Sequence, residues 1–208
     1  MVLNIYTDGC CKSNGKENSI GGYGIYFGEN DQRNVSKKIE GFVTNNIAEL
    51  SAMIHAMFLV KDIKEKVNIY SDSNYTILCC TSYGKKCYNN FWNNPNDKTK
   101  PIPNLELVKK AYLLAKDLNN VTFKYIRAHT GLEDEHSIGN ENADRLANES
   151  IGIVNNKNKK EKIYLNVKFD EKEEIKLLDG KWDYKKKKWF IYSDNKNKFK
   201  ILEKFSSF

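Results

Sequence analysis

The spacing of hydrophobic residues changes several times along the first 150 residues, which predicts strands alternating with helices. Short apolar runs bounded by Gly, Asn and Asp predict strands at residues 2–7, 22–27, 35–42, 67–71 and 121–128. Apolar residues at helical spacing predict helices at residues 47–58, 75–80, 105–118 and 141–150, with Asn45 or Asn46 as the first N-cap. The first three strands are spaced for antiparallel hairpins, whereas a strand–helix–strand crossover requires parallel pairing. The pattern therefore predicts an α/β domain with a mixed sheet.

The pattern changes again after residue 151. Residues 152–162 are mostly Asn and Lys, contain little that could pack, and predict a linker. Beyond them, residues 163–167 and 188–192 are strand-like, residues 171–178 are helical, and Gly180 is expected at C′ of that helix. We therefore expect a domain at residues 1–151, a linker at 152–162 and a small α+β unit at 163–208.

The hydrophobic runs, the cysteines and the distribution of charge limit where the protein acts and what it binds. No apolar run approaches the ~20 residues that span a bilayer, and Met1 leads directly into a predicted strand, so we expect neither membrane insertion nor secretion. Five cysteines without C-x-x-C spacing favour an intracellular, reducing compartment such as cytoplasm or nucleus.

The formal net charge of +7 lies entirely in residues 151–208, which hold 16 of the 34 Lys and Arg but only 9 of the 27 Asp and Glu. This asymmetry indicates a polyanion-binding segment, the alternative being a solvated Lys-rich tail.

Four carboxylates stand where an α/β fold can direct them to one point. Asp8 and Asp72 follow predicted strands, whereas Glu49 and Asp144 lie in predicted helices. Clustered carboxylates repel one another unless a cation neutralises them, and hard ions such as Mg²⁺ prefer oxygen ligands. Two such ions about 4 Å apart promote in-line attack of water on a phosphodiester. We expect two Mg²⁺ ions per active site, with Mn²⁺ able to substitute; the alternative is four unrelated surface acids.

The residues around these carboxylates resemble six motifs of the type 1 ribonuclease H family, in the family's order and within residues 1–150. The matching strings are Thr7-Asp8-Gly9-Cys10-Cys11 with Asn14, Gly21-Gly22-Tyr23-Gly24, Thr44-Asn45-Asn46-Ile47-Ala48-Glu49-Leu50, Tyr70-Ser71-Asp72-Ser73, His129-Thr130-Gly131 and Gly139-Asn140-Glu141-Asn142-Ala143-Asp144-Arg145-Leu146-Ala147. The resemblance implies a five-stranded mixed sheet with helices on both faces. It also implies an endoribonuclease that hydrolyses the RNA strand of RNA/DNA hybrid duplexes.

The resemblance gives each carboxylate a share of the metal site. Asp8, Asp72 and Asp144 would hold the ion that activates water, and Asp8 and Glu49 would hold the ion that stabilises the leaving 3′ oxygen. The products would then carry 5′-phosphate and 3′-hydroxyl ends.

Three further features lie near the predicted active site. His129 matches the family's flexible-loop histidine and would relay a proton near the attacking water, the alternative being a surface histidine. Glu141 would aid product release, the alternative being an acid in the first turn of a helix. Adjacent Cys10 and Cys11 beside Asp8 raise the hypothesis of a redox switch, although two plain thiols are the simpler expectation.

Ribonuclease H must distinguish RNA from DNA, and only the 2′-hydroxyl offers a donor and an acceptor for that purpose. By resemblance, the residues that contact the RNA strand, or in the case of Thr44 a DNA phosphate, are Cys11, Asn14, Thr44, Asn45, Asn46 and Asn74. Turn and helix-cap chemistry is the alternative for the Asn residues. Many relatives carry Arg where this chain has Phe42, which predicts a weaker phosphate pocket.

Residues 83–103 mix cations with aromatic rings and match the region where the family has a basic protrusion that grips the DNA strand. The predicted contacts are Tyr83, Lys85, Lys86 and Trp92. An ordinary loop whose aromatic side chains cover the edge of the core is the alternative.

The C-terminal unit is similar to a small domain of unknown function found beside nucleic-acid enzymes. Its Lys-rich turn at residues 185–188, beside Trp182, Tyr184 and Trp189, could clamp a phosphate backbone, although two Trp in so small a unit are most simply its core. The expected partner of this unit is nucleic acid or a replication protein.

Two other functions compete with hybrid cleavage. A catalytically silent hybrid-binding protein would lack a carboxylate, and all four are present. A DNA nuclease of the same fold, such as a resolvase or transposase, would lack amides that contact 2′-hydroxyls, and Asn14, Asn45 and Asn46 are present.

Overall fold

The chain folds as two compact units, Met1–Asn155 and Asn156–Phe208. The structure is a computed structural model that describes residues 2–128, 130, 132–153, 162–193 and 195–205. Most of the predicted linker, residues 154–161, lies outside the described residues, so the predicted domain boundaries stay predictions. No helix in the described part of the chain is both long and apolar enough to cross a membrane.

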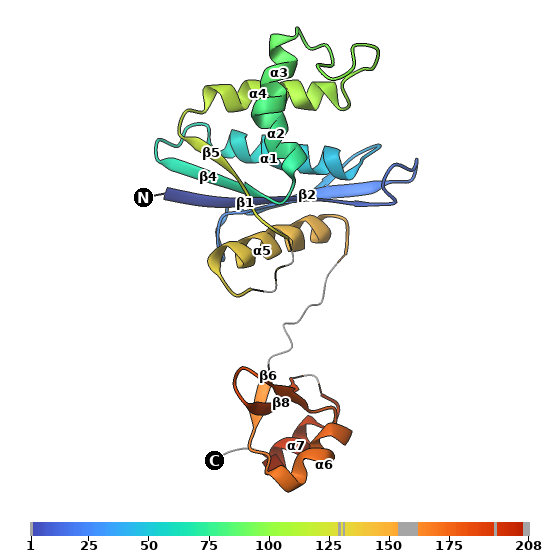
Figure 1. Cartoon of the computed structure of the whole chain (residues 1–208), viewed down its shortest axis with the longest axis vertical. Helices are drawn as coiled ribbons and strands as arrows, with labels where there is room; N and C mark the ends of the chain where they lie inside the picture. Colours follow the sequence, from blue (N-terminus) through green and yellow to red (C-terminus); the bar gives the residue numbers. More distant parts are fainter. Residues whose placement is uncertain (1, 129, 131, 154–161, 194, 206–208) are drawn as a thin grey trace. The chain divides into compact units, whose positions relative to one another are not determined.

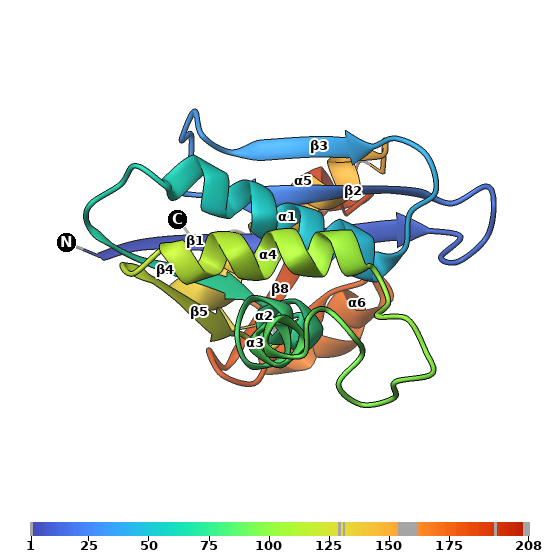
Figure 2. The same cartoon turned by 90° about the horizontal axis from the view of Figure 1, so that it is seen from above.

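A five-stranded mixed sheet forms the middle of the N-terminal unit (Figures 1 and 2), which confirms the predicted fold class. Its strands, in spatial order, are β3 (Val35–Ile39), β2 (Ile20–Tyr26), β1 (Val2–Lys12), β4 (Lys66–Ser71) and β5 (Val121–Tyr125). The three N-terminal strands pair antiparallel, as their short connections predict. β1 and β4 pair in parallel, as the crossover between them requires.

Helices cover both faces of the sheet (Figure 1). One face carries α1 (Asn45–Val60), α2 (Asn74–Cys80), α3 (Ser82–Asn89) and α4 (Leu105–Asp117), and the other carries α5 (Glu135–Ser150). The main core lies under α1 and α4, where the fully buried side chains include Ile5, Ile25, Leu50, Met53, Met57 and Ile69. Tyr6 and Tyr70 point to the opposite face, because successive strand residues alternate, and pack there with Ala143 of α5.

α5 packs unusually close to β2, because glycines leave room for its backbone. A Cβ at Gly24 would overlap the carbonyl oxygen of Ala143 and lie 2.7 Å from the backbone nitrogen of Ala147. The close approach matters for function, since α5 carries Asp144.

Gly24→Ala is therefore expected to lower the free energy of unfolding by about 1–3 kcal/mol, the usual cost of overpacking, and Gly24→Val to lower it further. Urea unfolding of the two variants measures this graded loss. A change below about 0.5 kcal/mol in both would show that α5 can move away from β2 at little cost.

Several predicted element ends were wrong in the N-terminal unit. β1 does not end at Thr7 but continues to Lys12, because β2 pairs with it along this whole length. α5 begins at Glu135 rather than Glu141, since the carboxylate of Asp134 accepts from two backbone N–H groups and caps an earlier start. β3 and β5 stop earlier than predicted, at Ile39 and Tyr125.

The predicted N-cap of α1 was also wrong. The residue that caps this helix is Thr44, whose hydroxyl accepts from the backbone N–H of Ile47 at 3.3 Å, rather than Asn45 or Asn46. Within residues 83–103, matched to the family's basic protrusion, the first part is helical, because α3 spans Ser82–Asn89.

The C-terminal unit has a three-stranded antiparallel sheet, in the order β6 (Lys162–Leu165), β8 (Lys188–Tyr192), β7 (Lys181–Asp183). A 3₁₀ turn, η1 (Phe169–Glu171), leads into α6 (Lys172–Leu177), and α7 (Lys198–Phe205) follows the sheet. The sequence did not predict β7 or α7. Asp179, with φ of 61°, occupies C′ of α6 where Gly180 was predicted, and the Gly180 N–H instead donates to the Ile175 carbonyl at 2.8 Å.

Candidate active site

Three carboxylates meet at one edge of the N-terminal sheet. Ligand oxygens of Asp8, Glu49 and Asp72 all lie within 4.8 Å of one another. Asp8 lies in β1 and Asp72 directly follows β4, and the parallel register that pairs Thr7 with Ser71 brings these next residues side by side. Glu49 reaches the same point from the second turn of α1.

Gly9 allows α1 to bring Glu49 this close. A Cβ at Gly9 would overlap the backbone nitrogen of Glu49, so any larger residue would push the helix away from β1. The Gly9 N–H also donates to Oδ1 of Asp8 at 2.9 Å, which helps to orient that carboxylate.

The electrostatics of the cluster favour neutralisation. Burial, followed by the charges of Asp72 and Asp144, raises the pKa of Asp8 to about 8. Burial, followed by the charges of Asp8 and Asp72, raises the pKa of Glu49 as well. Oε2 of Glu49 is buried without a hydrogen-bond partner among the described residues. A buried set of carboxylate oxygens with one oxygen unsatisfied fits a hard divalent cation.

Asp144 lies in α5 just outside this group of three. Its Oδ1 accepts a hydrogen bond from Nδ2 of Asn148 at 2.8 Å, so the side chain is held along its own helix. Its charge nevertheless contributes to the raised pKa of Asp8. The structure thus brings three of the four predicted carboxylates together and places the fourth within electrostatic reach.

Asn140 is a site residue for which the sequence predicted no role. Its side chain is 4% exposed, and its Nδ2 donates to Oδ2 of Asp72 at 3.4 Å. Its Oδ1 is buried without a hydrogen-bond partner among the described residues. In the sequence Asn140 lies one residue before the helix start predicted at Glu141, so the late start predicted for α5 concealed its inward position.

Asn140→Ala is expected to lower kcat by about 10–100-fold with little change in KM, because Asp72 would lose the group that orients it. Asn142→Ala is the matched control, since the Asn142 amide bonds within α5 to the Ile138 carbonyl. Steady-state kinetics and circular dichroism separate loss of positioning from loss of fold. Equal activity of the two variants would exclude a positioning role.

His129 lies outside the described residues, and its predicted catalytic role stays a prediction. His136, for which the sequence predicted no role, contacts two strand tyrosines, each two residues before Asp8 or Asp72. Its Nδ1 is 2.9 Å from the hydroxyl of Tyr6 and its Nε2 is 3.4 Å from that of Tyr70. These contacts fasten the first turn of α5 to β1 and β4.

Four of the predicted substrate-binding residues gather at the N-terminus of α1. Thr44 caps the helix, and the backbone N–H of Asn45 donates to Oδ1 of Asn14 at 3.1 Å. Asn14, Asn45 and Asn46 are exposed, and Asn45 and Asn46 lie about one helical turn before Glu49. The helix-cap and turn contacts leave the Asn45 and Asn46 amides facing solvent beside the carboxylates.

The other two predicted substrate contacts lie on neighbouring elements. Asn74 is exposed in the first turn of α2, two residues after Asp72. Cys11 lies in β1, and its thiol donates to the carbonyl oxygen of Val43 at 3.3 Å.

The two adjacent cysteines face opposite sides of β1 and have raised pKa values, which disfavours the hypothesis of a redox switch. The Cys10 thiol donates to the carbonyl oxygen of Ala147 in α5, whereas that of Cys11 faces Val43 on the other side of β1. Burial raises the pKa of Cys10 to about 11 and also raises the pKa of Cys11. A raised pKa suppresses the reactive thiolate. All five cysteines are described, and all are free thiols.

The residues predicted to grip the DNA strand divide into two kinds. Lys85 and Lys86 are exposed on α3. Tyr83 and Trp92 are partly buried against the core, and the Trp92 ring meets that of Tyr112 edge-on at 6.3 Å. The two aromatic residues therefore have a structural role at the edge of the core.

Glu141, predicted to aid product release, is exposed in the second turn of α5 rather than in its first turn.

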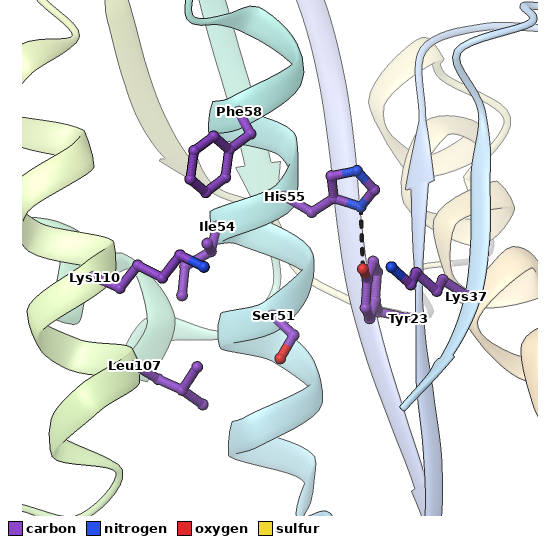
Figure 3. A pocket seen from close by; sticks show the side chains of 8 residues that line it. All are labelled: Tyr23, Lys37, Ser51, Ile54, His55, Phe58, Leu107 and Lys110. Carbon is purple, nitrogen blue, oxygen red and sulfur yellow. Dashed lines mark hydrogen bonds between the residues drawn. The ribbon is translucent and has the colours of Figure 1, made fainter. Parts of the chain in front are cut away.

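A pocket of about 250 Å³ opens elsewhere on the N-terminal unit (Figure 3). It lies between α1, α4 and strands β2 and β3, and its lining residues are Tyr23, Lys37, Ser51, Ile54, His55, Phe58, Leu107 and Lys110. The Tyr23 hydroxyl is 3.1 Å from Nδ1 of His55. No carboxylate lines the pocket, so it is separate from the candidate active site.

Comparison with known proteins decides the family. The family model described as RNase H matches residues 1–152, nearly three quarters of the chain. The chain belongs to the ribonuclease H family. Its N-terminal domain is therefore a ribonuclease H domain of the hydrolase class, as the sequence motifs predicted. A second family model, a domain of unknown function (DUF5710), matches residues 162–201 and confirms the resemblance found there.

Individual relatives agree with the ribonuclease H assignment. Ribonuclease H of Clostridium botulinum (strain Hall) is 38% identical over 154 residues, covering 73% of this chain and 96% of that protein. Ribonuclease H of Schizosaccharomyces pombe is 36% identical over 144 residues, covering 69% of this chain but only half of that protein. A foamy viral protease-reverse transcriptase solved in complex with RNA/DNA hybrid shares the fold, with a TM-score of 0.60 at 21% identity over 71% of this chain and 20% of that one.

Proposed function

We propose that this ribonuclease H family member is an endonuclease that hydrolyses the RNA strand of RNA/DNA hybrids by a mechanism with two metal ions. The observation that carries the proposal is the cluster of Asp8, Glu49 and Asp72 within 4.8 Å. Mg²⁺ is the proposed ion, with Mn²⁺ as a substitute, because the donor set consists of carboxylate oxygens. The names of the relatives and the foamy viral complex with hybrid support the choice of substrate.

When bound, the metal ions lower the pKa of a water molecule and neutralise charge on the leaving oxygen. In the proposal, Asp8 would help to hold both ions, since its carboxylate lies with those of Glu49 and Asp72 and is affected by the charge of Asp144. Asp72 and Asp144 would hold one ion with it, and Glu49 the other. Asn140 orients Asp72, and His129 relays the proton of the attacking water.

Discrimination against DNA is assigned to the amides at the N-terminus of α1. Asn45 and Asn46 are exposed there, about one turn from Glu49, and the exposed Asn14 accepts from the Asn45 N–H. Uncharged amides can both donate to and accept from a 2′-hydroxyl. We propose that Cys11 and Asn74 contribute main-chain contacts, and Thr44 a DNA phosphate contact. Lys85 and Lys86 on α3 would follow the DNA strand, and Glu141 would help the product to leave.

The alternatives are less well supported by these residues. A silent hybrid-binding protein gives no reason for a buried carboxylate cluster with raised pKa values. A DNA nuclease gives no reason for three exposed amides beside the carboxylates. We propose a reducing compartment as the place of action, in keeping with five free thiols.

The cleavage products provide a direct test of this chemistry. Cleavage by water activated at the carboxylate cluster should leave 5′-phosphate and 3′-hydroxyl ends, which ligation and mass spectrometry can identify. A 2′,3′-cyclic phosphate would instead show attack by the RNA 2′-hydroxyl and would contradict the proposal.

A further inference from the structure

The three-stranded sheet of the C-terminal unit has two unlike faces. Successive strand residues point to opposite faces, and on one face Leu165 and Ile191 pack with side chains of α6 and α7, namely Ile175, Ile201 and Phe205. Figure 1 shows both helices on one side of the strands. By the same alternation, Tyr164, Phe190 and Tyr192 lie on the other face.

This outer face is a row of aromatic rings covered by lysines. The Tyr164 and Phe190 ring centroids are 5.9 Å apart, and those of Phe190 and Tyr192 are 5.4 Å apart. An ammonium group lies over each ring: Lys186 over Tyr164 at 4.6 Å, Lys162 over Phe190 at 4.6 Å, and Lys181 over Tyr192 at 5.1 Å. Lys188 extends the row opposite Asp183. The face therefore presents four lysines and one acid, Asp183, on the paired strands.

The acids of the unit lie mostly on the helical side. Residues 169–179, which include η1 and α6, hold five of the nine acidic residues in 151–208. Two lysines of the helices are neutralised there, because Lys176 pairs with Glu173 at 2.8 Å and Lys204 with Glu174 at 2.6 Å. The unit is thus divided into a mixed-charge helical side and a cationic sheet face.

Asp183, the one acid within the three strands, is already engaged. Its Oδ2 accepts from Nζ of Lys162 at 3.1 Å and from the Tyr164 hydroxyl at 2.8 Å, and its Oδ1 accepts from two backbone N–H groups of the β7–β8 turn. These hydrogen bonds hold the pKa of Asp183 well below its usual range. Its charge orders the turn and offsets that of Lys162, with which it pairs, so Lys181, Lys186 and Lys188 supply the excess positive charge of this face.

We propose that this sheet face binds the phosphodiester backbone of nucleic acid through Lys162, Lys181, Lys186 and Lys188. Closely spaced cations beside aromatic rings suit phosphate tracking, and Tyr184, 86% exposed in the turn, adds an uncovered ring. This surface differs from the Trp-based clamp predicted from sequence, because Trp189 packs against the core. The proposal is independent of the hydrolase activity proposed above.

The full chain in EDTA, which prevents cleavage, provides the test. Fluorescence anisotropy would measure binding to single-stranded DNA of about 20 nucleotides and to a DNA duplex of the same length, at about 50 to 200 mM salt. The double variant Lys186→Glu, Lys188→Glu should weaken binding about tenfold and lower the slope of log K against log salt by about 1 to 2. Weaker binding of both DNAs would show that the face recognises the phosphodiester backbone that they share. Weaker binding of the single strand alone would show that the face prefers single strands. Either result supports the proposal.

The matched control is Lys196→Glu, Lys200→Glu, which makes the same charge change beside and within α7. It should alter affinity less than about threefold, because α7 packs through Ile201 and Phe205 against the opposite face of the sheet. Unchanged binding in the Lys186, Lys188 variant, or equal loss in the control, would overturn the proposal and favour a protein partner on the exposed apolar residues Phe169, Leu177 and Phe199. Hybrid cleavage with Mg²⁺ is scored separately: kcat should match the parent in both double variants, so failure of the proposed hydrolase function would be recognised independently.

Discussion

Asp8→Asn should lower kcat for hybrid cleavage by about a thousandfold or more while leaving the protein folded. Asp8 is the most buried of the carboxylates, 7% exposed, and interacts with the other three. An amide removes the charge that holds a cation while keeping nearly the same volume. The neutral amide should not destabilise the fold without metal, because burial and the neighbouring acids already favour the neutral form of Asp8 by raising its pKa.

The matched control is Asp62→Asn, which removes a carboxylate whose side chain is 89% exposed, and it should keep parental activity. Single-turnover cleavage measures the chemical step, and thermal unfolding without metal checks the fold. Cleavage by Asp8→Asn within tenfold of the parent would show that this carboxylate does not hold the reacting metal.

Without divalent ions, the free energy of unfolding should fall as pH rises from about 4 to about 8. The folded protein keeps a proton on Asp8 up to about pH 8, whereas the unfolded chain gives it up near pH 4. The folded state therefore binds more protons in this window, and stability is lost as pH rises through it. Mg²⁺ should reverse the loss, raising the free energy of unfolding by about 2.7 kcal/mol at a hundredfold excess over Kd, with a larger gain at pH 8 than at pH 5.

Urea unfolding at the two pH values, with Mg²⁺ or EDTA, measures this effect in the parent and in Asp8→Asn. The variant should show a flatter pH profile and a smaller gain from Mg²⁺. Acids with a lowered pKa, such as Asp31 with a pKa of about 2, change the free energy of unfolding only below about pH 4. They therefore do not affect the comparison between pH 5 and pH 8. An equal Mg²⁺ gain at both pH values would contradict the assignment of the cation to this cluster.

The strands and their pairing were predictable because the hydrophobic period changed clearly between elements. The parallel pairing of β1 and β4 followed from the intervening helix, and with it the meeting of Asp8 and Asp72. Glu49 was predictable because α1 has a clear apolar face and begins just before it.

The features that the sequence did not predict share a physical cause. Tertiary contacts, rather than the local hydrophobic pattern, determine where they form. The first turn of α5 is polar, and its start depends on the Asp134 cap and on His136 bonding to Tyr6. Asn140 became visible only once that start was known. β7 is three residues long, too short for a period, and exists because β8 pairs with it.

The central claim is tested most directly by cleavage of four matched duplexes with Mg²⁺: RNA·DNA, RNA·RNA, DNA·DNA, and DNA with one embedded ribonucleotide. Parent and Asp72→Asn would be compared on each. We predict that the parent cuts only the RNA strand of the hybrid and that Asp72→Asn cuts none of the four. Binding of the hybrid without cleavage by the parent, or cleavage of DNA·DNA, would contradict the account.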